Sequence, residues 1–331
     1  LPYSAEQFDK YRQLLQQSKS EDFSFLVHVG DFKASYAECS DQSFDQICQI
    51  FRNYPKPVIY TPGDNDWTDC HRTGQDPIER LKKLRLMFYH DHRTLRLNEL
   101  NVEQQSRNPR FKKYIENYRF TKSNALFVVA HIVGSNNNYW PQSVVAMNEF
   151  RERNVATLAF LKESFTLAER QKFAGVVLII HANPNFENSG EYEDGNGEGF
   201  VGFLNLLHQF LASYSHPVIC IHGDTHLYRI DKPFKDRKDQ VYNHFRRIEV
   251  FGSPFVSGVD ITVNTNTDDI FNFEESTLSK LNVRICSAKK RKFSAALGIS
   301  TDFDNERGLP VSRDSTSANL SACESIPFAI W

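Results

Sequence analysis

The chain has 331 residues, of which 40% are hydrophobic and 24% charged, and its formal net charge is −2 at pH 7. This length is enough for a sizeable core in one large domain or two. The nearly balanced charge gives no support for a nucleic-acid partner or for a strongly anionic membrane surface. We find no secretory signal and no apolar run long enough to span a membrane, in a sequence that starts with Leu rather than Met.

Helix and strand patterns alternate over the first two thirds of the chain. Ser4-Ala5-Glu6-Gln7 is a capping box, which predicts a helix to about Ser18. In chain order there follow a strand over 23–29, a helix over 44–51, a strand over 57–61, a helix from Pro77, a strand over 125–133, a helix over about 144–173 with a break near Phe165-Thr166, a strand over 175–180, a helix over 200–213 and a strand over 218–221. These strands are nearly continuous in Val, Ile and Leu, which predicts parallel strands buried on both faces.

Three regions depart from this alternation. Residues 89–123 are irregular and predict an excursion or lid. After Leu227, short strands over 246–251, 259–263 and 281–285 without helices predict a second, largely antiparallel sheet. From Ser287 the chain is rich in Ser, Lys and Arg, so we expect one domain over 1–286 and a linker or extended tail over 287–331.

Polar side chains follow four of the predicted strands, in the stretches VHVGD (27–31), VIYTPGDNDWTDCHR (58–72), VLIIHANP (177–184) and VICIHGDTH (218–226). The carboxyl edge of such a sheet is where open α/β folds bind ligands. The residues gathered there are Asp31, Asp64, Asn65, Asp66, His181, Asp224 and His226. Carboxylates with imidazoles suit Zn, Mn or Fe, and enough of them are present for two metals. The alternative is that the acids are turn residues and the histidines belong to the core.

Six cysteines occur without a CxxC pair, which argues against a zinc ribbon. Cys39 and Cys70 each follow a strand-end carboxylate, so both lie in loops over the same sheet edge. They form either a disulfide, which favours a secreted, periplasmic or other oxidising compartment, or two free loop thiols.

At these motifs the chain resembles the calcineurin-like metallophosphoesterases across roughly residues 1–265. HVGDFK, TPGDNDWTDCHR, GSNNN, HANP and HGDTH are similar to a bacterial-type branch of that family. The resemblance implies a two-sheet α/β/β/α sandwich with a dinuclear site for divalent Mn, Fe, Zn or Mg. It also implies that the first strand of the family falls upstream of residue 1.

The resemblance assigns five metal ligands, which are Asp31 as the bridging carboxylate, Asp64, His181, Asp224 and His226. Asp64 stands where the family has Asn, and Asp224 where it has the first His of GHxH. Asn65 occupies the place of the catalytic His and carries no proton for a leaving group, so His71 and Arg72 are the candidate donors or phosphate-binding groups. Asn136 and Asn137 of GSNNN either line the cleft or form a left-handed turn.

We therefore expect a metal-dependent hydrolase of phosphate mono- or diesters. Its partner would be a small phosphate ester or a phosphoprotein. The alternative is a catalytically degenerate module of the same fold that serves binding or assembly, because Asn65 and Asp224 replace two family histidines.

Overall fold

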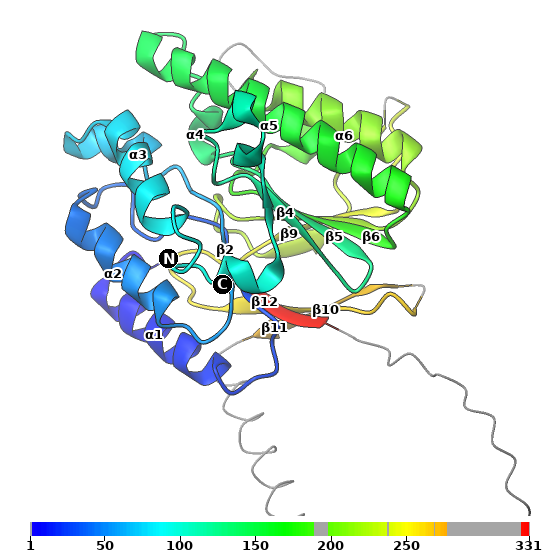
Figure 1. Cartoon of the computed structure of the whole chain (residues 1–331), viewed down its shortest axis with the longest axis horizontal. Helices are drawn as coiled ribbons and strands as arrows, with labels where there is room; N and C mark the ends of the chain where they lie inside the picture. The colour runs from blue at the N-terminus through cyan, green and yellow to red at the C-terminus, as the bar shows by residue number, and fades with distance from the viewer. Residues whose placement is uncertain (1, 189–197, 237, 268, 277–325, 331) are drawn as a thin grey trace, which may run out of the picture.

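The structure is a computed structural model that describes residues 2–188, 198–236, 238–267, 269–276 and 326–330. Two β-sheets face each other, and helices cover their outer faces (Figure 1). The predicted two-sheet α/β/β/α sandwich is thus confirmed.

The first sheet has the strand order β11-β10-β12-β1-β2. Its strands are β1 (Leu26–His28), β2 (Val58–Tyr60), β10 (Gly258–Val263), β11 (Phe271–Ser276) and β12 (Ile326–Ile330). Strand β1 runs parallel to both β2 and β12, whereas β10 is antiparallel to β11 and β12. The helices beside this sheet are α1 (Ala5–Ser18), α2 (Asp41–Arg52) and α3 (Pro77–Phe88) (Figure 1). The side chains of Ser4 and Ser40 cap α1 and α2 by accepting backbone hydrogen bonds, as the sequence predicts for α1.

The second sheet has the strand order β3-β4-β5-β6-β7-β9-β8. Its strands are β3 (Glu103–Gln104), β4 (Tyr118–Lys122), β5 (Ala125–Val129), β6 (Gly175–Ile179), β7 (Val218–His222), β8 (Arg229–Asp231) and β9 (Phe245–Glu249). Strands β5, β6, β7 and β9 are parallel. In β5, Leu126 and Val128 pack with α5 (Val144–Gln171) and α6 (Val201–Ser213), while Phe127 and Val129 face the core shared with the first sheet. This alternation explains why the central strands are apolar throughout.

The remaining elements are short and lie in the connections. They are α4 (Gly134–Asn137), η1 (Thr68–Thr73), η2 (Leu97–Leu100), η3 (Gln105–Arg107), η4 (Pro109–Phe111), η5 (Phe186–Asn188) and η6 (Glu198–Phe200). No helix among the described residues combines the length and apolar character needed to cross a membrane.

The structure corrects four expectations. Residues 89–123 are not only an excursion, because β3 and β4 in this range form one end of the second sheet. Helix α5 has no break near Phe165-Thr166, where the Thr166 hydroxyl donates to the Lys162 carbonyl one turn earlier. The late strands do not form one antiparallel sheet, since β9 runs parallel to β7 in the second sheet and β10 belongs to the first. The expected strand over 281–285 lies outside the described residues.

The fourth correction concerns the expected tail over 287–331. Residues 326–330 form β12, which lies between β1 and β10 in the first sheet and buries Phe328, Ala329 and Ile330. Residues 277–325 and 331 lie outside the described residues. The last strand therefore contributes to the same sheet that positions Asp31.

Candidate metal centre

Four loops meet where parallel strands of the two sheets end. Asp31 follows β1 and Asp64 follows β2 in the first sheet, while His181 follows β6 and Asp224 follows β7 in the second. Parallel strands present their carboxyl ends at one edge, and the facing sheets bring the two edges together. The fold thus places side chains that are far apart in sequence around one point.

Asp31, Asp64 and His181 form the tightest group, in which one potential ligand atom from each residue lies within 4.8 Å of the others. His181 Nε2 lies 3.2 Å from Asp64 Oδ1 and 3.5 Å from Asp31 Oδ1. The other ring nitrogen, Nδ1, donates to the Val29 carbonyl at 2.6 Å. Since that bond fixes Nδ1–H, Nε2 is the nitrogen that is directed at the carboxylates, as in histidines that bind metals. These three residues are hereafter the metal cluster.

Asp224 and His226 lie beside the metal cluster. Asp224 Oδ1 is 3.9 Å from His181 Nε2, and Asp224 Oδ2 accepts a hydrogen bond from the Asn183 backbone. Both residues share a small cavity of about 30 Å³ with Asp31 and His181. His226 Nε2 lies 3.2 Å from the Tyr3 hydroxyl. All five predicted ligands thus lie in one neighbourhood, although only three of them form the metal cluster.

Glycines allow the loops to come this close. Gly30 has φ +93°, and a Cβ atom there would lie 2.4 Å from the Gly63 backbone nitrogen. A Cβ atom at Gly134 would lie 2.5 Å from Asp224 Oδ1 and 2.6 Å from Asp64 Oδ2. A larger residue at Gly30 would push apart the loops that carry Asp31 and Asp64, and one at Gly134 would displace the carboxylates of Asp64 and Asp224.

The protonation behaviour of the site reflects crowded negative charge. Burial raises the pKa of Asp31 well above its usual value and that of Asp224 to about 6. Burial opposes ionisation of His181, yet the charges of Asp31, Asp64 and Asp224 raise its pKa well above the usual value. A positive charge beside these buried carboxylates would favour their ionised form, and the His181 ring is the nearest group that can carry one. A divalent cation would have the same effect, so the donor set fits the metals that the family uses.

Asn65 belongs to the same constellation. Its backbone N–H lies 3.1 Å from Asp31 Oδ1 and 2.9 Å from Asp64 Oδ1. Its side-chain amide donates to Asp31 Oδ2 at 2.8 Å and to the Tyr3 hydroxyl at 2.9 Å. Asn65 is thus placed to orient groups at the metal cluster, and its amide remains a hydrogen-bond donor at any pH near neutrality.

His71 and Arg72 lie farther away, in η1. His71 Nδ1 donates to the Thr68 carbonyl at 2.8 Å, and Arg72 forms an ion pair with Asp69 at 3.1 Å. Arg72 connects to Asp64 through Asp69 and Ser135, whose Oγ lies 3.0 Å from Asp69 Oδ1 and 2.7 Å from Asp64 Oδ2. His71 connects to Asp64 through Thr68, whose hydroxyl donates to the Asp64 carbonyl at 2.9 Å. The structure therefore does not place His71 or Arg72 in contact with the metal cluster.

Asp66 holds the loops in place. Its carboxylate accepts hydrogen bonds from the backbone N–H groups of Asp31, Phe32 and Gly63 and from the Tyr60 hydroxyl. The side chain is fully buried. Both carboxylate oxygens thus bind donors of the two loops that carry Asp31 and Asp64, which indicates a structural role.

A disulfide between Cys39 and Cys70 joins the same two loops, with their Cα atoms 5.6 Å apart. Of the two alternatives for these cysteines, the structure has the bonded one. Cys39 and Cys70 Sγ also approach the carbonyls of Asn65 and Asp66. The disulfide therefore lies directly against the GDND segment.

GSNNN forms a left-handed turn, with φ between 48° and 61° at all four residues from Ser135 to Asn138. This conformation is unfavourable for residues that carry a Cβ atom, and among these asparagine tolerates it well. The buried guanidinium of Arg153 stabilises the turn by donating to the Asn137 side chain at 2.6 Å and to its carbonyl at 2.8 Å. Of the two alternatives for GSNNN, the left-handed turn is present, and Asn136 also lines a hollow at this site. The first residue of the turn, Ser135, is directed at Asp64.

Tyr3 is a residue of this site that the sequence analysis did not identify. Its hydroxyl donates to Asp31 Oδ2 at 2.7 Å, accepts from Asn65 and lies beside His226. Its partners are 28, 62 and 223 positions away in sequence, so no local pattern indicates these contacts. The only signal is its place directly before the cap of α1, at the end of the chain that meets the sheet edge.

Tyr3→Phe is expected to lower the free energy of unfolding of the metal-free protein by about 1–2 kcal/mol, because a hydroxyl bonded to a buried carboxyl is lost. Urea unfolding measures this change. Tyr36→Phe is the matched control, since Tyr36 is 75% exposed and loses the same atom. Equal free energies of unfolding for the two variants would contradict the role of the hydroxyl.

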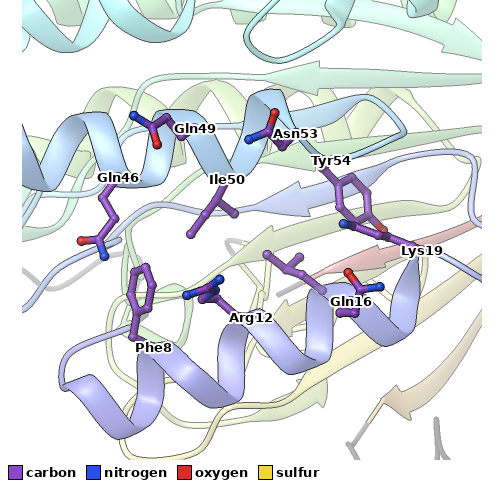
Figure 2. Close-up of a pocket in the computed structure, with 10 residues that line it drawn as sticks. Phe8, Arg12, Gln16, Lys19, Gln46, Gln49, Ile50, Asn53 and Tyr54 are labelled. Carbon is purple, nitrogen blue, oxygen red and sulfur yellow. The ribbon is translucent and has the colours of Figure 1, made fainter.

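A separate groove lies between α1 and α2, away from this site. Figure 2 shows Arg12 of α1 and Lys19, which follows α1, across from Gln46 and Gln49 of α2 and Asn53, which follows α2. It contains none of the metal ligands expected from the sequence.

The two-sheet sandwich with acids and histidines at its strand ends defines a metallophosphoesterase-like protein. The family model of the calcineurin-like phosphoesterases matches residues 4–228, so the chain belongs to this family. No curated protein matches the chain. The matched residues include the metal cluster, Asp224 and His226, whereas β8 to β12 lie beyond the match.

Proposed function

We propose that the protein is a metal-dependent phosphoesterase that hydrolyses a phosphate mono- or diester at a dinuclear site. The observation that carries the proposal is the metal cluster, in which two carboxylates and an imidazole nitrogen converge in a member of this family. Its metals would be divalent Mn, Fe, Zn or Mg, and the substrate would be a small phosphate ester or a phosphoprotein.

In this proposal Asp31, Asp64, His181, Asp224 and His226 would hold the two metals, with Asp31 as the carboxylate that both would share. Bound divalent metals supply Lewis acidity and a water that is acidic enough to ionise near neutral pH. The chain's own groups bind and orient the substrate. Asn65 donates its two amide hydrogens to Asp31 and Tyr3 in this structure, and it would turn one of them to a phosphate oxygen of the substrate. The Tyr3 hydroxyl holds the Asp31 carboxylate in position.

His71 and Arg72 line a hollow that begins at Ser135. In this proposal the organic part of the ester lies in that hollow, so both residues are near the leaving group. We assign the proton donor for the leaving group to His71. Arg72 suits phosphate oxygens, which a guanidinium binds with two parallel donors. Its carboxylate partner Asp69 keeps it near the entrance.

The second candidate is a catalytically degenerate binding or assembly module of the same fold. Asn65 favours it, since this residue replaces the family's catalytic histidine with an amide. The two candidates differ in metal content and turnover, not in fold.

Reconstituted protein is expected to hold two equivalents of Mn, Fe or Zn and to hydrolyse a generic aryl phosphate. Elemental analysis measures the metal, and a chelator should remove both metal and activity in parallel. Readdition of the metal should restore activity, which separates metal loss from unfolding. Protein that takes up no metal after reconstitution, yet remains folded, would favour the binding module.

A further inference from the structure

A hollow of about 430 Å³ opens next to the metal cluster. Its walls are the η1 loop, the left-handed turn at 135–138 and the first turn of α5. This volume lies in the usual range for sites that bind small molecules.

The hollow begins one side chain away from Asp64. Ser135 and Asp69 both line it, and Ser135 Oγ is 2.7 Å from Asp64 Oδ2. The cavity on the other side of the metal cluster, lined by Tyr3, Asp224 and His226, has only about 30 Å³. That is room for roughly one water or ion. Of these two cavities, only the larger one can hold the organic part of a substrate whose phosphate lies at the metal cluster.

The side chains that line the hollow suit an aromatic ring of the substrate better than a second phosphate group of the substrate. Trp140 is 47% exposed there, and its ring centroid is 5.5 Å from that of His71. Val145, which is 62% exposed, and Ile78 add apolar surface. Arg72, the guanidinium that the described part of the chain contributes to the wall, is paired with Asp69. A partly exposed Trp beside apolar side chains provides a flat face for stacking.

We propose that this hollow binds a planar aromatic ring in the organic part of the substrate, stacked on Trp140. The proposal rests on the proposed function, with the phosphate at the metal cluster and the ring in the hollow. Hydrolysis breaks the P–O bond to the organic group, and a water oxygen replaces it on phosphorus. The alcohol leaves with a proton from His71, which regains one that the water releases. Trp140 determines specificity and takes no part in proton transfer. The substrate class is therefore phosphate esters of aromatic alcohols or of nucleosides.

Benzyl phosphate and cyclohexylmethyl phosphate test the proposal, because both are esters of primary alcohols of similar size and only one carries a planar ring. We expect kcat/KM of the metal-loaded protein to be roughly tenfold higher for benzyl phosphate, the size of effect that aromatic contacts produce. Trp140→Leu keeps an apolar side chain and should bring the ratio close to one, mainly through the loss of benzyl phosphate turnover.

Tyr36→Leu is the matched control, because it removes an exposed aromatic ring that lines neither cavity. It should keep the wild-type ratio. A ratio near one in the wild type, or an unchanged ratio in Trp140→Leu, overturns the proposal while the proposed function stands.

If neither ester is hydrolysed by metal-loaded protein, the proposed function fails, and the ring site is then decided by binding. Calorimetry with benzylphosphonate and cyclohexylmethylphosphonate should show tighter binding of the aromatic compound, and Trp140→Leu should abolish the difference. Equal binding, or none, overturns the ring site as well.

A second pair of phosphate esters distinguishes the two possible substrates, which are nucleoside phosphates and phosphates of small aromatic alcohols. A nucleoside 5′-monophosphate should exceed ribose 5-phosphate in kcat/KM if nucleosides are bound, and Trp140→Leu should remove the excess. Similar values for this pair, with the benzyl preference retained, assign the hollow to small aromatic esters.

Discussion

Asp31→Asn is expected to abolish metal uptake and to lower the hydrolysis of an aryl phosphate by a factor on the order of 10³ or more. Asp31 contributes a ligand atom to the metal cluster, and in the proposed site it bridges both metals. An amide retains the size of the side chain but removes the negative charge that attracts the cation. Elemental analysis and steady-state kinetics measure the two losses.

Asp9→Asn is the matched control for this substitution, since Asp9 is exposed on α1 and makes the same change of charge. It should leave metal content and turnover unchanged. The metal-free Asp31→Asn protein should remain folded, because it carries one carboxyl fewer beside Asp64 and Asp224. Full activity in Asp31→Asn would rule out the proposed function.

Replacing both Cys39 and Cys70 with Ala is expected to lower the free energy of unfolding by about 3–4 kcal/mol. The disulfide closes a segment with a sequence separation of 31, and a cross-link of this length restricts the unfolded chain by about that amount. Chemical unfolding under non-reducing conditions measures the change. Because the disulfide lies against the GDND segment, metal affinity should fall together with stability.

Cys48→Ala is the control for the loss of a buried thiol, since Cys48 is free and packs between α2 and α3. It should destabilise the protein by less than the double variant. A double variant as stable as Cys48→Ala would show that the bond contributes nothing. Mass spectrometry without reductant tests the bond itself, and its presence in the native protein would favour an oxidising compartment.

The sequence predicted the parts of the site that are local in the chain. Asp31, Asp64 and His181 each end a continuous apolar strand, and parallel strands must bring such ends to a common edge. The left-handed turn was also a local alternative, because three asparagines after a glycine suit that conformation.

The parts that sequence did not predict depend on contacts over long distances. Tyr3 bonds to Asp31 and Asn65, and Arg153 binds the turn at Asn137 from a different element. The pattern of short strands after Leu227 does not specify their partners. It therefore predicts a separate antiparallel sheet for β9, which instead lies beside β7, and a tail in place of β12. A two-residue alternation indicates which face of a strand is buried, but not which strand lies beside it.

The left-handed turn also determines where substrate preference can change during evolution or engineering. Four successive residues with positive φ exclude β-branched side chains at 135–138, so this wall of the hollow tolerates few replacements. Trp140 and Val145 lie just beyond it, outside the positive-φ segment, and both are partly exposed. Libraries that vary these two positions and keep GSNNN should therefore alter selectivity without loss of folding, whereas libraries that vary the turn should mainly yield unstable proteins.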